Sequence, residues 1–357
     1  EAQDISGSTR TGIVDDTGTA DMGFHVGASP SAGVPAISQP PSSGSPATYY
    51  VDAASGDDVR SEIDARDSST PWKTIGRAFQ FAMGGDTVLV AAGTYAESVS
   101  TSAAGVELRA TGAATITPPS AGLSAVNVLH ANVKIDGFTL QGGTHGVRAQ
   151  SASGVVVRRC RIQGQTSNGI WLSDSPAAVI DGNRVSSPPS RGILLTRSSG
   201  AYVRNNLVVG AGDWGIQLNS AGGSLSSGNV VAFNTVYGAG RLSAAGGIRL
   251  QNATGEIRDN LVIANTDRGI RVDTKPTSIH HNDVLGSTVP FDAAAGQDPT
   301  LWLNYAVDPA FVDAAGGDFA LKQTAAGQAQ DSPVLDLGSA GVAAADISGS
   351  TRSDGVA

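Results

Sequence analysis

The sequence predicts an all-β solenoid, a rod of stacked coils, and two repeating features support this. The first is a Gly-[Ile/Val] dipeptide that returns every 22 or 23 residues, with one interval of 32. A period in the twenties with one strand-like core per period indicates a solenoid. The dipeptide occurs at Gly146-Val147, Gly169-Ile170, Gly192-Ile193, Gly215-Ile216, Gly247-Ile248 and Gly269-Ile270.

The second feature is alternation between apolar and mostly polar residues after each glycine. The first and third residues are apolar, as in Ile170 and Leu172, and a period of two predicts a half-buried strand. The residues between and after them should therefore form an outward face. They are Arg148, Trp171, Leu194, Gln217, Arg249 and Arg271, followed by Gln150, Ser173, Thr196, Asn219, Gln251 and Asp273.

A column of mostly asparagines lies upstream of these strands. Stacked asparagines are expected to form side-chain hydrogen bonds from coil to coil, and asparagine tolerates the left-handed backbone of a tight turn. Apolar residues follow each asparagine, as in Leu207-Val208-Val209, and predict a second strand per coil. Cys160, the single cysteine, falls in this column and is expected to be a buried filler. The column is Gly137, Cys160, Asn183, Asn206, Asn234, Asn260 and Asn282.

Motifs at both ends of the solenoid carry a family resemblance. Residues 49–338 resemble secreted right-handed parallel β-helix proteins of the pectate-lyase-like superfamily, which implies that fold over about four fifths of the chain. This superfamily contains lyases, hydrolases, epimerases and non-enzymatic surface proteins, so the resemblance leaves the activity open. The motifs are Tyr49-Tyr50-Val51-Asp52, Pro71-Trp72-Lys73-Thr74-Ile75, Gly85-Asp86-Thr87-Val88, Gly93-Thr94-Tyr95, Asp308-Pro309-Ala310-Phe311-Val312 and Ser332-Pro333-Val334-Leu335-Asp336-Leu337-Gly338.

One amphipathic helix is expected just before the first coil, where it would cap the open end of the rod. Ser69 or Thr70 would be its N-cap, and Pro71 suits the first turn. Its apolar face would consist of Ile75, Ala78, Phe79 and Ala82, and Gly84-Gly85 would end it.

Composition limits the partners. The formal charge is −9 and only four residues are lysine, which argues against nucleic acid and anionic membranes as partners. The sequence contains no transmembrane run and no signal peptide, and it starts at Glu1 as a mature or excised product would. A rod without disulfides is compatible with a secreted bacterial protein, so we expect an extracellular or cell-surface location.

The two ends of the chain share a heptapeptide. Residues 4–10 read DISGSTR, and residues 346–352 repeat this sequence. Residues 1–27 therefore resemble the tail of a preceding module, 28–48 form a Ser/Pro-rich linker, and 339–357 resemble a truncated tail. Either the modules form a covalent tandem array, or the N-terminal segment completes a neighbouring copy head-to-tail. The candidate inter-module residues are Asp4, Ile5, Arg10, Asp21, Met22, Phe24 and His25.

Candidate chemistry lies on the outward strand face. A polysaccharide lyase needs a base and a group that neutralises the uronate carboxylate, and Arg249, Arg271, Asp273 and Lys275 are the best local set. A glycosidase needs two or three carboxylates near one bond, and the outward columns supply only Asp273.

An acidic loop precedes the first coil. Asp57, Asp58, Glu62, Asp64 and Asp67 supply oxygen ligands suited to Ca²⁺, but their spacing does not match a 12-residue calcium loop. A solvated acidic loop is the favoured interpretation, and no cofactor is expected. The pair His280-His281 has no evident third metal ligand, so we interpret it as turn residues.

Two tryptophans complete the outward face. Trp171 and Trp214, with Arg148, suit either sugar stacking or subunit contacts. We therefore predict a structural or adhesive module that associates with copies of itself. The alternatives are a polysaccharide lyase or epimerase, and a non-catalytic glycan-binding module.

Overall fold

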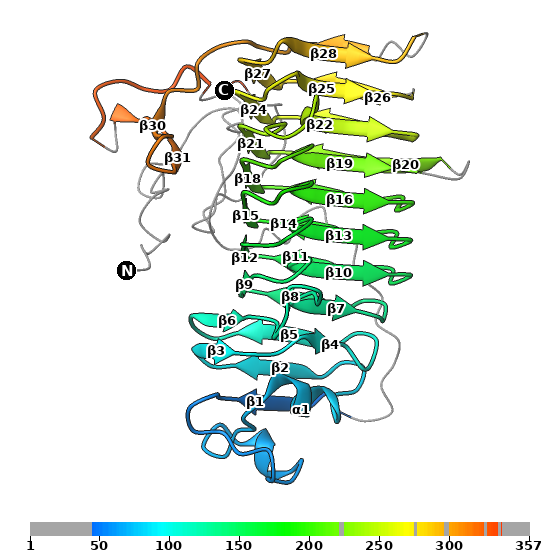
Figure 1. Ribbon diagram of the computed structural model, residues 1–357, viewed down its shortest axis with the longest axis vertical. Helices are drawn as coiled ribbons and strands as arrows, with labels where there is room; N and C mark the ends of the chain where they lie inside the picture. The colour runs from blue at the N-terminus through cyan, green and yellow to red at the C-terminus, as the bar shows by residue number, and fades with distance from the viewer. Residues whose placement is uncertain are drawn as a thin grey trace, which may run out of the picture.

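The computed structural model describes residues 45–220, 225–274, 277–295, 300–324, 327–334 and 337. Three parallel sheets run along one elongated rod, and the chain visits them in turn at every coil (Figure 1). Two of the sheets contain nine strands each among the described residues, so the solenoid has about nine coils. The predicted all-β parallel solenoid is confirmed.

Sheet A is the longest and contains eleven strands within the described ranges. Its strands are β1 Thr48–Val51, β2 Thr87–Val90, β5 Glu107–Ala110, β8 Lys134–Asp136, β11 Val156–Arg158, β14 Val179–Asp181, β17 Tyr202–Arg204, β20 Ser226–Ala232, β23 Ala253–Arg258, β26 Thr277–His280 and β29 Thr300–Trp302.

Sheet B follows sheet A in each coil after a tight turn. Its strands are β3 Gly93–Tyr95, β6 Ala114–Ile116, β9 Thr139–Gln141, β12 Arg161–Gln163, β15 Arg184–Ser186, β18 Leu207–Val209, β21 Thr235–Tyr237, β24 Leu261–Ile263 and β27 Asp283–Leu285.

Sheet C carries the Gly-[Ile/Val] repeat. Its strands are β4 Val99–Ser100, β7 Val126–Val128, β10 Val147–Gln150, β13 Ile170–Ser173, β16 Ile193–Thr196, β19 Ile216–Asn219, β22 Gly246–Gln251, β25 Arg268–Val272 and β28 Val289–Ala293.

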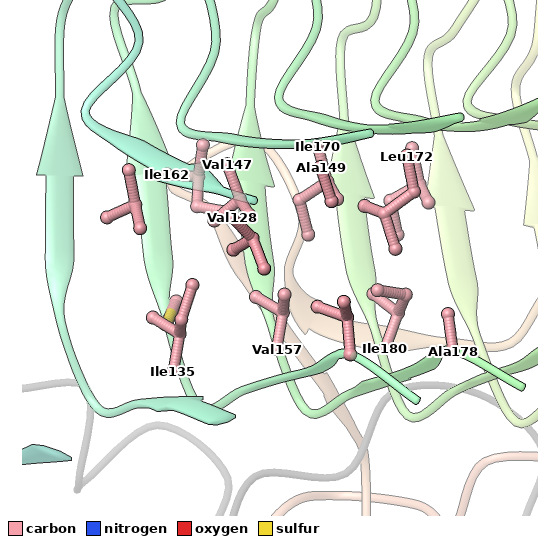
Figure 2. Packing of buried hydrophobic residues seen from close by; sticks show 14 of the residues in the cluster. Val128, Ile135, Val147, Ala149, Val157, Ile162, Ile170, Leu172, Ala178 and Ile180 are labelled. Atoms are coloured by element: carbon pink, nitrogen blue, oxygen red, sulfur yellow. The ribbon is translucent and has the colours of Figure 1, made fainter. Parts of the chain in front are cut away.

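The register confirms the predicted columns on sheet C. Val147 pairs with Ile170, which pairs with Ile193, and all three are fully buried. Figure 2 shows Val147 and Ile170 facing Val157 and Ile180 across the interior. Burying a side chain of this size contributes about 1.5–3 kcal/mol, so the stacked columns form the main core.

Crowding explains why glycine precedes each inward residue. A Cβ added at Gly192 would lie 2.3 Å from Val208 Cγ1 and 2.5 Å from the Gly215 carbonyl oxygen. At Gly169 the corresponding contacts are 2.4 Å to Val185 Cγ1 and 2.6 Å to the Gly192 carbonyl oxygen. The repeat therefore marks the place where the inner surface of sheet B meets the start of the sheet C strand.

The asparagine column forms the predicted ladder in the turn between sheets A and B. The Nδ2 of Asn183 donates to Asn206 Oδ1 at 3.0 Å, and the Nδ2 of Asn206 donates to Asn234 Oδ1 at 3.0 Å. The ladder continues through Asn260 and Asn282 to Asn304, one coil further than predicted. It begins at Cys160, whose backbone N–H donates to Asn183 Oδ1 at 3.0 Å.

The start of the asparagine column differs from the prediction at one position and agrees with it at another. Phe138, not Gly137, occupies the position equivalent to Cys160, because Thr139 pairs with Arg161. Gly137 lies one position earlier and has a φ of 83°. Cys160 is buried as predicted, and burial raises the pKa of its thiol to about 12, which makes it unreactive.

The helix is shorter than expected and begins later. Helix α1 spans Ile75–Phe79, and its N-cap is Thr74, whose hydroxyl accepts a hydrogen bond from the Arg77 N–H at 3.2 Å. Ser69 and Thr70 therefore do not cap it. The buried residues of α1 are the predicted Ile75, Ala78 and Phe79.

The late start of α1 has a local cause. Trp72 is extended and forms a bridge with Val51 of β1, and its N–H donates to the Tyr50 carbonyl at 2.9 Å. The residues before Thr74 therefore cannot adopt helical geometry. A 3-10 helix covers Asp64–Arg66 earlier in the same region. None of the helices in the described part of the chain is long and apolar enough to cross a membrane.

The segment after the last coil packs against sheet B. Strands β30 Phe311–Asp313 and β31 Asp318–Leu321 form an antiparallel pair to one side of the rod (Figure 1). The Tyr237 ring of β21 contacts Phe319 at 5.0 Å between ring centroids. The proposed inter-module residues Asp4, Ile5, Arg10, Asp21, Met22, Phe24 and His25 lie outside the described residues.

Candidate functional site

The outward face of sheet C brings together most of the residues that the sequence pattern singled out. The parallel register places Arg148 beside Trp171, which lies one coil later. It likewise places Arg249 beside Arg271 of the following coil. Their neighbours along each strand point inward and are buried, as Leu172 and Leu250 show. The face is therefore a set of side-chain rows along the rod axis.

Three members of the lyase constellation lie in contact. Asp273 Oδ2 accepts hydrogen bonds from Arg249 Nη2 at 2.6 Å and Nε at 2.8 Å. Its Oδ1 accepts from Arg271 Nε at 2.7 Å. Asp273 thus bridges arginines from adjacent coils. The fourth candidate, Lys275, lies outside the described residues.

The ion pairs extend beyond the predicted set. Arg271 Nη1 also donates to Asp292 Oδ2 at 2.8 Å, and the same oxygen accepts from Arg268 Nε. Arg268 in turn pairs with Asp267. Sequence analysis missed Asp292 because its coil has Pro290 where the repeat has glycine; extending the strand register past Gly269 would have found it.

This bonding determines what Arg271 can do chemically. Burial lowers the pKa of its guanidinium, but hydrogen bonds and the charges of Asp273 and Asp292 outweigh that effect and raise the pKa above its ordinary value. A guanidinium with a raised pKa stays charged and does not accept a proton. Arg271 is therefore suited to holding carboxylates and poorly suited to acting as a general base.

A second cluster surrounds Trp171. The Arg148 guanidinium lies 5.4 Å from the centroid of the half-buried Trp171 ring, and the His145 ring lies 5.2 Å away at an interplanar angle of 49°. Arg148 Nη2 also donates to Gln150 Oε1 at 2.6 Å. Sequence analysis missed His145, which precedes the repeat glycine and so lies one position outside the predicted columns.

The protonation of His145 follows from its surroundings. Burial lowers its pKa, and its Nδ1 lies 3.3 Å from the Asn168 backbone N–H. Because that N–H is a donor, Nδ1 accepts and the proton of the neutral ring is assigned to Nε2. His145 thus packs as a neutral ring beside Trp171, and with 7% exposure it offers little surface of its own.

Trp214 does not share the exposure that the sequence suggested. It is only 4% exposed, so it offers little surface for stacking a sugar. The Arg249 guanidinium lies 5.6 Å from its ring centroid. The prediction of an exposed Trp214 is wrong, because this position precedes the strand and is covered there.

Polar side-chain bonds also join the coils that lie between the two clusters. Arg191 Nη2 pairs with Asp213 at 2.8 Å, and its Nε donates to Gln217 Oε1 at 2.8 Å. Gln217 Nε2 then donates to Gln251 Oε1 at 3.1 Å. Neighbouring coils are thus joined by side chains as well as by their backbones.

The acidic loop uses its carboxylates for local hydrogen bonds. Asp58 accepts from the backbone N–H groups of Lys73 and Thr74 at 2.8 and 3.0 Å. Asp64 accepts from Ser61, and Asp67 from Ser69. Asp57 accepts from the Val59 N–H at 3.1 Å. No group of three potential metal ligands gathers among the described residues.

Of the pair His280-His281, His280 lies in a strand of sheet A, away from this face, so its interpretation as a turn residue is wrong. His280 ends β26 and is 5% exposed, because the Trp302 ring stacks on it at 4.2 Å. His280 Nε2 lies 2.8 Å from Glu256 Oε1. His281 occupies the following turn with a φ of 52°, as a turn residue would.

Comparison with known proteins identifies the architecture. A family model described as a right-handed β-helix region matches residues 124–289. No curated protein sequence matches the chain. Among solved structures, pectate lyase Pel9A is similar with a TM-score of 0.53 and 14% identity, over 81% of this chain and 88% of that one.

Other similar structures have different functions. A GH136 lacto-N-biosidase from Eubacterium ramulus gives a TM-score of 0.50 at 12% identity, over 73% of this chain and 68% of that one. The Dettilon tailspike protein gives 0.51 at 15% identity, over 74% of this chain and 63% of that one. The TM-scores indicate a shared fold, and identities this low leave the activity open.

Proposed function

We propose that this right-handed parallel β-helix is a structural and adhesive module of a bacterial surface or filamentous assembly. In this role the stacked coils form a stiff rod, and the N-terminal segment joins each rod head-to-tail to a neighbouring copy. The module would act outside the cell, where an adhesive rod meets its partners.

One observation carries this proposal. The arginines and aspartates on sheet C neutralise one another from coil to coil, in the order Arg249, Asp273, Arg271 and Asp292. Proton abstraction needs a group that is free to accept a proton. The side chains expected to act in catalysis instead hold adjacent coils together, which suits a rod under mechanical load.

The C-terminal end of the rod supports head-to-tail joining. Strands β29 and β28 end sheets A and C among the described residues. Leu301, Trp302 and Leu303 follow this edge and are 48%, 44% and 57% exposed. Exposed apolar edge strands readily accept a further strand, and residues 1–27 of a neighbour are the segment we propose to supply it.

If the N-terminal end of the rod is covered, neighbouring copies can join only at the C-terminal end. Trp72 bridges to β1, the first strand of sheet A, and α1 packs its buried Ile75 and Phe79 into the adjoining core. We propose that this region caps the N-terminal end. Growth would then depend on the N-terminal segment and proceed as an open filament.

A competition experiment tests the proposal. A synthetic peptide of residues 1–27 added to the full chain should shorten the assemblies seen by light scattering, because it occupies the edge that a neighbour needs. A scrambled peptide of the same composition is the control. Equal effects of the two peptides, or no effect of either, would contradict the donated segment.

The surroundings of Trp171 favour a second candidate function, contact with a glycan. A half-buried indole flanked by Arg148 and neutral His145 combines a stacking surface with polar groups, as sugar sites do. The lyase or epimerase alternative stays a prediction. It requires that the double change Arg271→Ala and Lys275→Ala abolish formation of product, an unsaturated uronate for a lyase or an epimerised uronate for an epimerase, while leaving the assemblies intact.

A further inference from the structure

Two arginines lie side by side on the outer face of sheet B. Arg161 begins β12 and Arg184 begins β15, and the two residues pair directly in the parallel register. The next residues, Ile162 and Val185, are fully buried, so the arginine side chains point away from the core. Adjacent parallel strands lie about 4.8 Å apart, which places two positive charges close together.

The hydrogen bonds of Arg184 leave its guanidinium incompletely satisfied. Nη1 and Nη2 both reach the Gly317 carbonyl oxygen, at the long distances of 3.4 and 3.3 Å. Nε is buried and has no hydrogen-bond partner among the described residues. Gly317, in the turn between β30 and β31, therefore supplies one acceptor for the several donors of Arg184.

Neither arginine has an ion-pair partner in the described part of the chain. Arg161 Nε donates to Gln163 Oε1 at 3.2 Å, a neutral acceptor. Burial and then the charge of Arg161 lower the pKa of Arg184, and Asp318 opposes this from beyond ion-pair distance. Asp318 already accepts a hydrogen bond from the Ala320 N–H at 3.0 Å. Arginine cannot release its charge at ordinary pH, so the pair stays doubly positive.

Two other arginines, at the end of the neighbouring sheet A strand, are neutralised by a carboxylate. Arg158 and Arg159 lie two or three residues before Arg161, and both bind Asp136, which is fully buried. Arg158 Nη2 lies 2.8 Å from Asp136 Oδ2, and Arg159 Nε donates to Oδ1 at 2.7 Å. A buried carboxylate thus serves two arginines on sheet A, whereas the equivalent acceptor on sheet B is missing from the described residues.

We propose that Arg161 and Arg184 form a binding site for an oxyanion, namely a carboxylate, sulfate or phosphate group held against the turn at Gly317. Arg184 Nε is a donor without a partner among the described residues, and Arg161 supplies a second positive charge beside it. The group belongs to an external ligand.

The full-length chain can be tested with sodium sulfate against sodium chloride at equal ionic strength. The Nε–Hε resonances of Arg161 and Arg184 should shift saturably with sulfate, and the midpoint of thermal unfolding should rise. Arg184→Gln should weaken sulfate binding at least roughly tenfold, the loss expected for one charge-assisted hydrogen bond. Arg109→Gln is the matched control, because Arg109 is exposed on sheet A and lies 3.8 Å from Glu107.

The same measurements distinguish a binding site from a purely structural role. A saturable response to sulfate that is weakened in Arg184→Gln and kept in Arg109→Gln supports the site. No saturable response in the unmodified chain would overturn the proposal, and a lower unfolding midpoint in Arg184→Gln would then reflect only its lost contact with Gly317.

Discussion

The side-chain amide of Asn206 donates to Asn234 Oδ1 at 3.0 Å, and the backbone N–H of Asn206 donates to the same oxygen at 3.0 Å. The amide also reaches the carbonyls of Ile180 and Arg204, at 2.9 and 2.8 Å. One asparagine therefore satisfies groups from three consecutive coils. This is why a turn around a fully buried asparagine can repeat along the rod.

Replacing Asn206 should be among the most destabilising single changes in the turn. Asn206→Ala removes these bonds and leaves buried donors and acceptors of Asn183 and Ile180 without partners, so we expect a loss of about 3 kcal/mol in the free energy of unfolding. Urea denaturation would measure it. Asn219→Ala, on the half-exposed outer face, should cost less than about 1 kcal/mol. Equal losses would contradict the ladder's role.

The repeat glycine gives a second stability prediction. Gly192→Ala would place a methyl group 2.5 Å from the Gly215 carbonyl oxygen, a backbone atom that can move only if the coil shifts. We expect a loss of at least about 2 kcal/mol, measured as a lower urea midpoint. Gly122→Ala is the control, because the nearest atom to its added methyl is Ser120 Oγ at 3.9 Å. A Gly192→Ala protein as stable as the control would refute the crowding argument.

The burial of Asp283 should make the free energy of unfolding depend on pH. Its side chain is fully buried under the segment after the last coil, where Oδ1 accepts from the Val307 N–H at 2.9 Å and Oδ2 has no partner among the described residues. Burial raises the pKa of this carboxyl to about 6, the Val307 hydrogen bond lowers it, and the charge of Asp308 raises it. The folded protein therefore favours the protonated form.

The sign of the effect follows from linkage. The pKa of an unfolded aspartate is about 3.9. The contribution of protonated Asp283 to the free energy of unfolding is therefore fully present below that pH and is lost as the pH rises through about 6. The loss should be of order 2–3 kcal/mol. Asp283→Asn should remove this component, so the difference between the two urea midpoints should change over that pH range. A constant difference across the range would exclude a raised pKa.

Trp171 predicts the outcome of a glycan-binding assay. If sheet C binds a polysaccharide, the unmodified protein should migrate more slowly in gels that contain a neutral or uronate polysaccharide than in gels without it. The Trp171→Ala protein should not be slowed in this way. Tyr202→Ala is the matched control, because Tyr202 is a half-buried outward aromatic residue on sheet A, away from this face and from the ends of the rod. Equal retardation of both variants on every polysaccharide would remove the second candidate function.

The repeat made the fold readable from the sequence, since glycine, inward aliphatic residues and asparagine each recur for a steric or hydrogen-bonding reason. The helix start was missed because Trp72 is held by a long-range bridge to Val51. The burial of Trp214 and the partner of Arg271 at Asp292 were missed for a similar reason. Both depend on neighbouring coils, which the strand pattern of one coil does not describe.

The charge pairing on the outer faces was the least predictable part. Arg158 and Arg161 look alike in sequence. Arg158 nevertheless binds the buried Asp136 of the preceding coil, whereas Arg161 faces Arg184. Arg158 lies on sheet A and Arg161 on sheet B, and the register between coils decides which side chain each one meets. A single alignment of the repeat therefore predicts which residues face outward, but not which of them are neutralised.

The most direct test of the central proposal is the mass and shape of the native protein with and without residues 1–27. Light scattering and negative-stain microscopy should show concentration-dependent oligomers or filaments of the full chain, one rod wide, and only single rods after the deletion. Circular dichroism would confirm that the shortened chain keeps its β-structure. Single rods in both preparations would contradict a module that associates through its N-terminal segment.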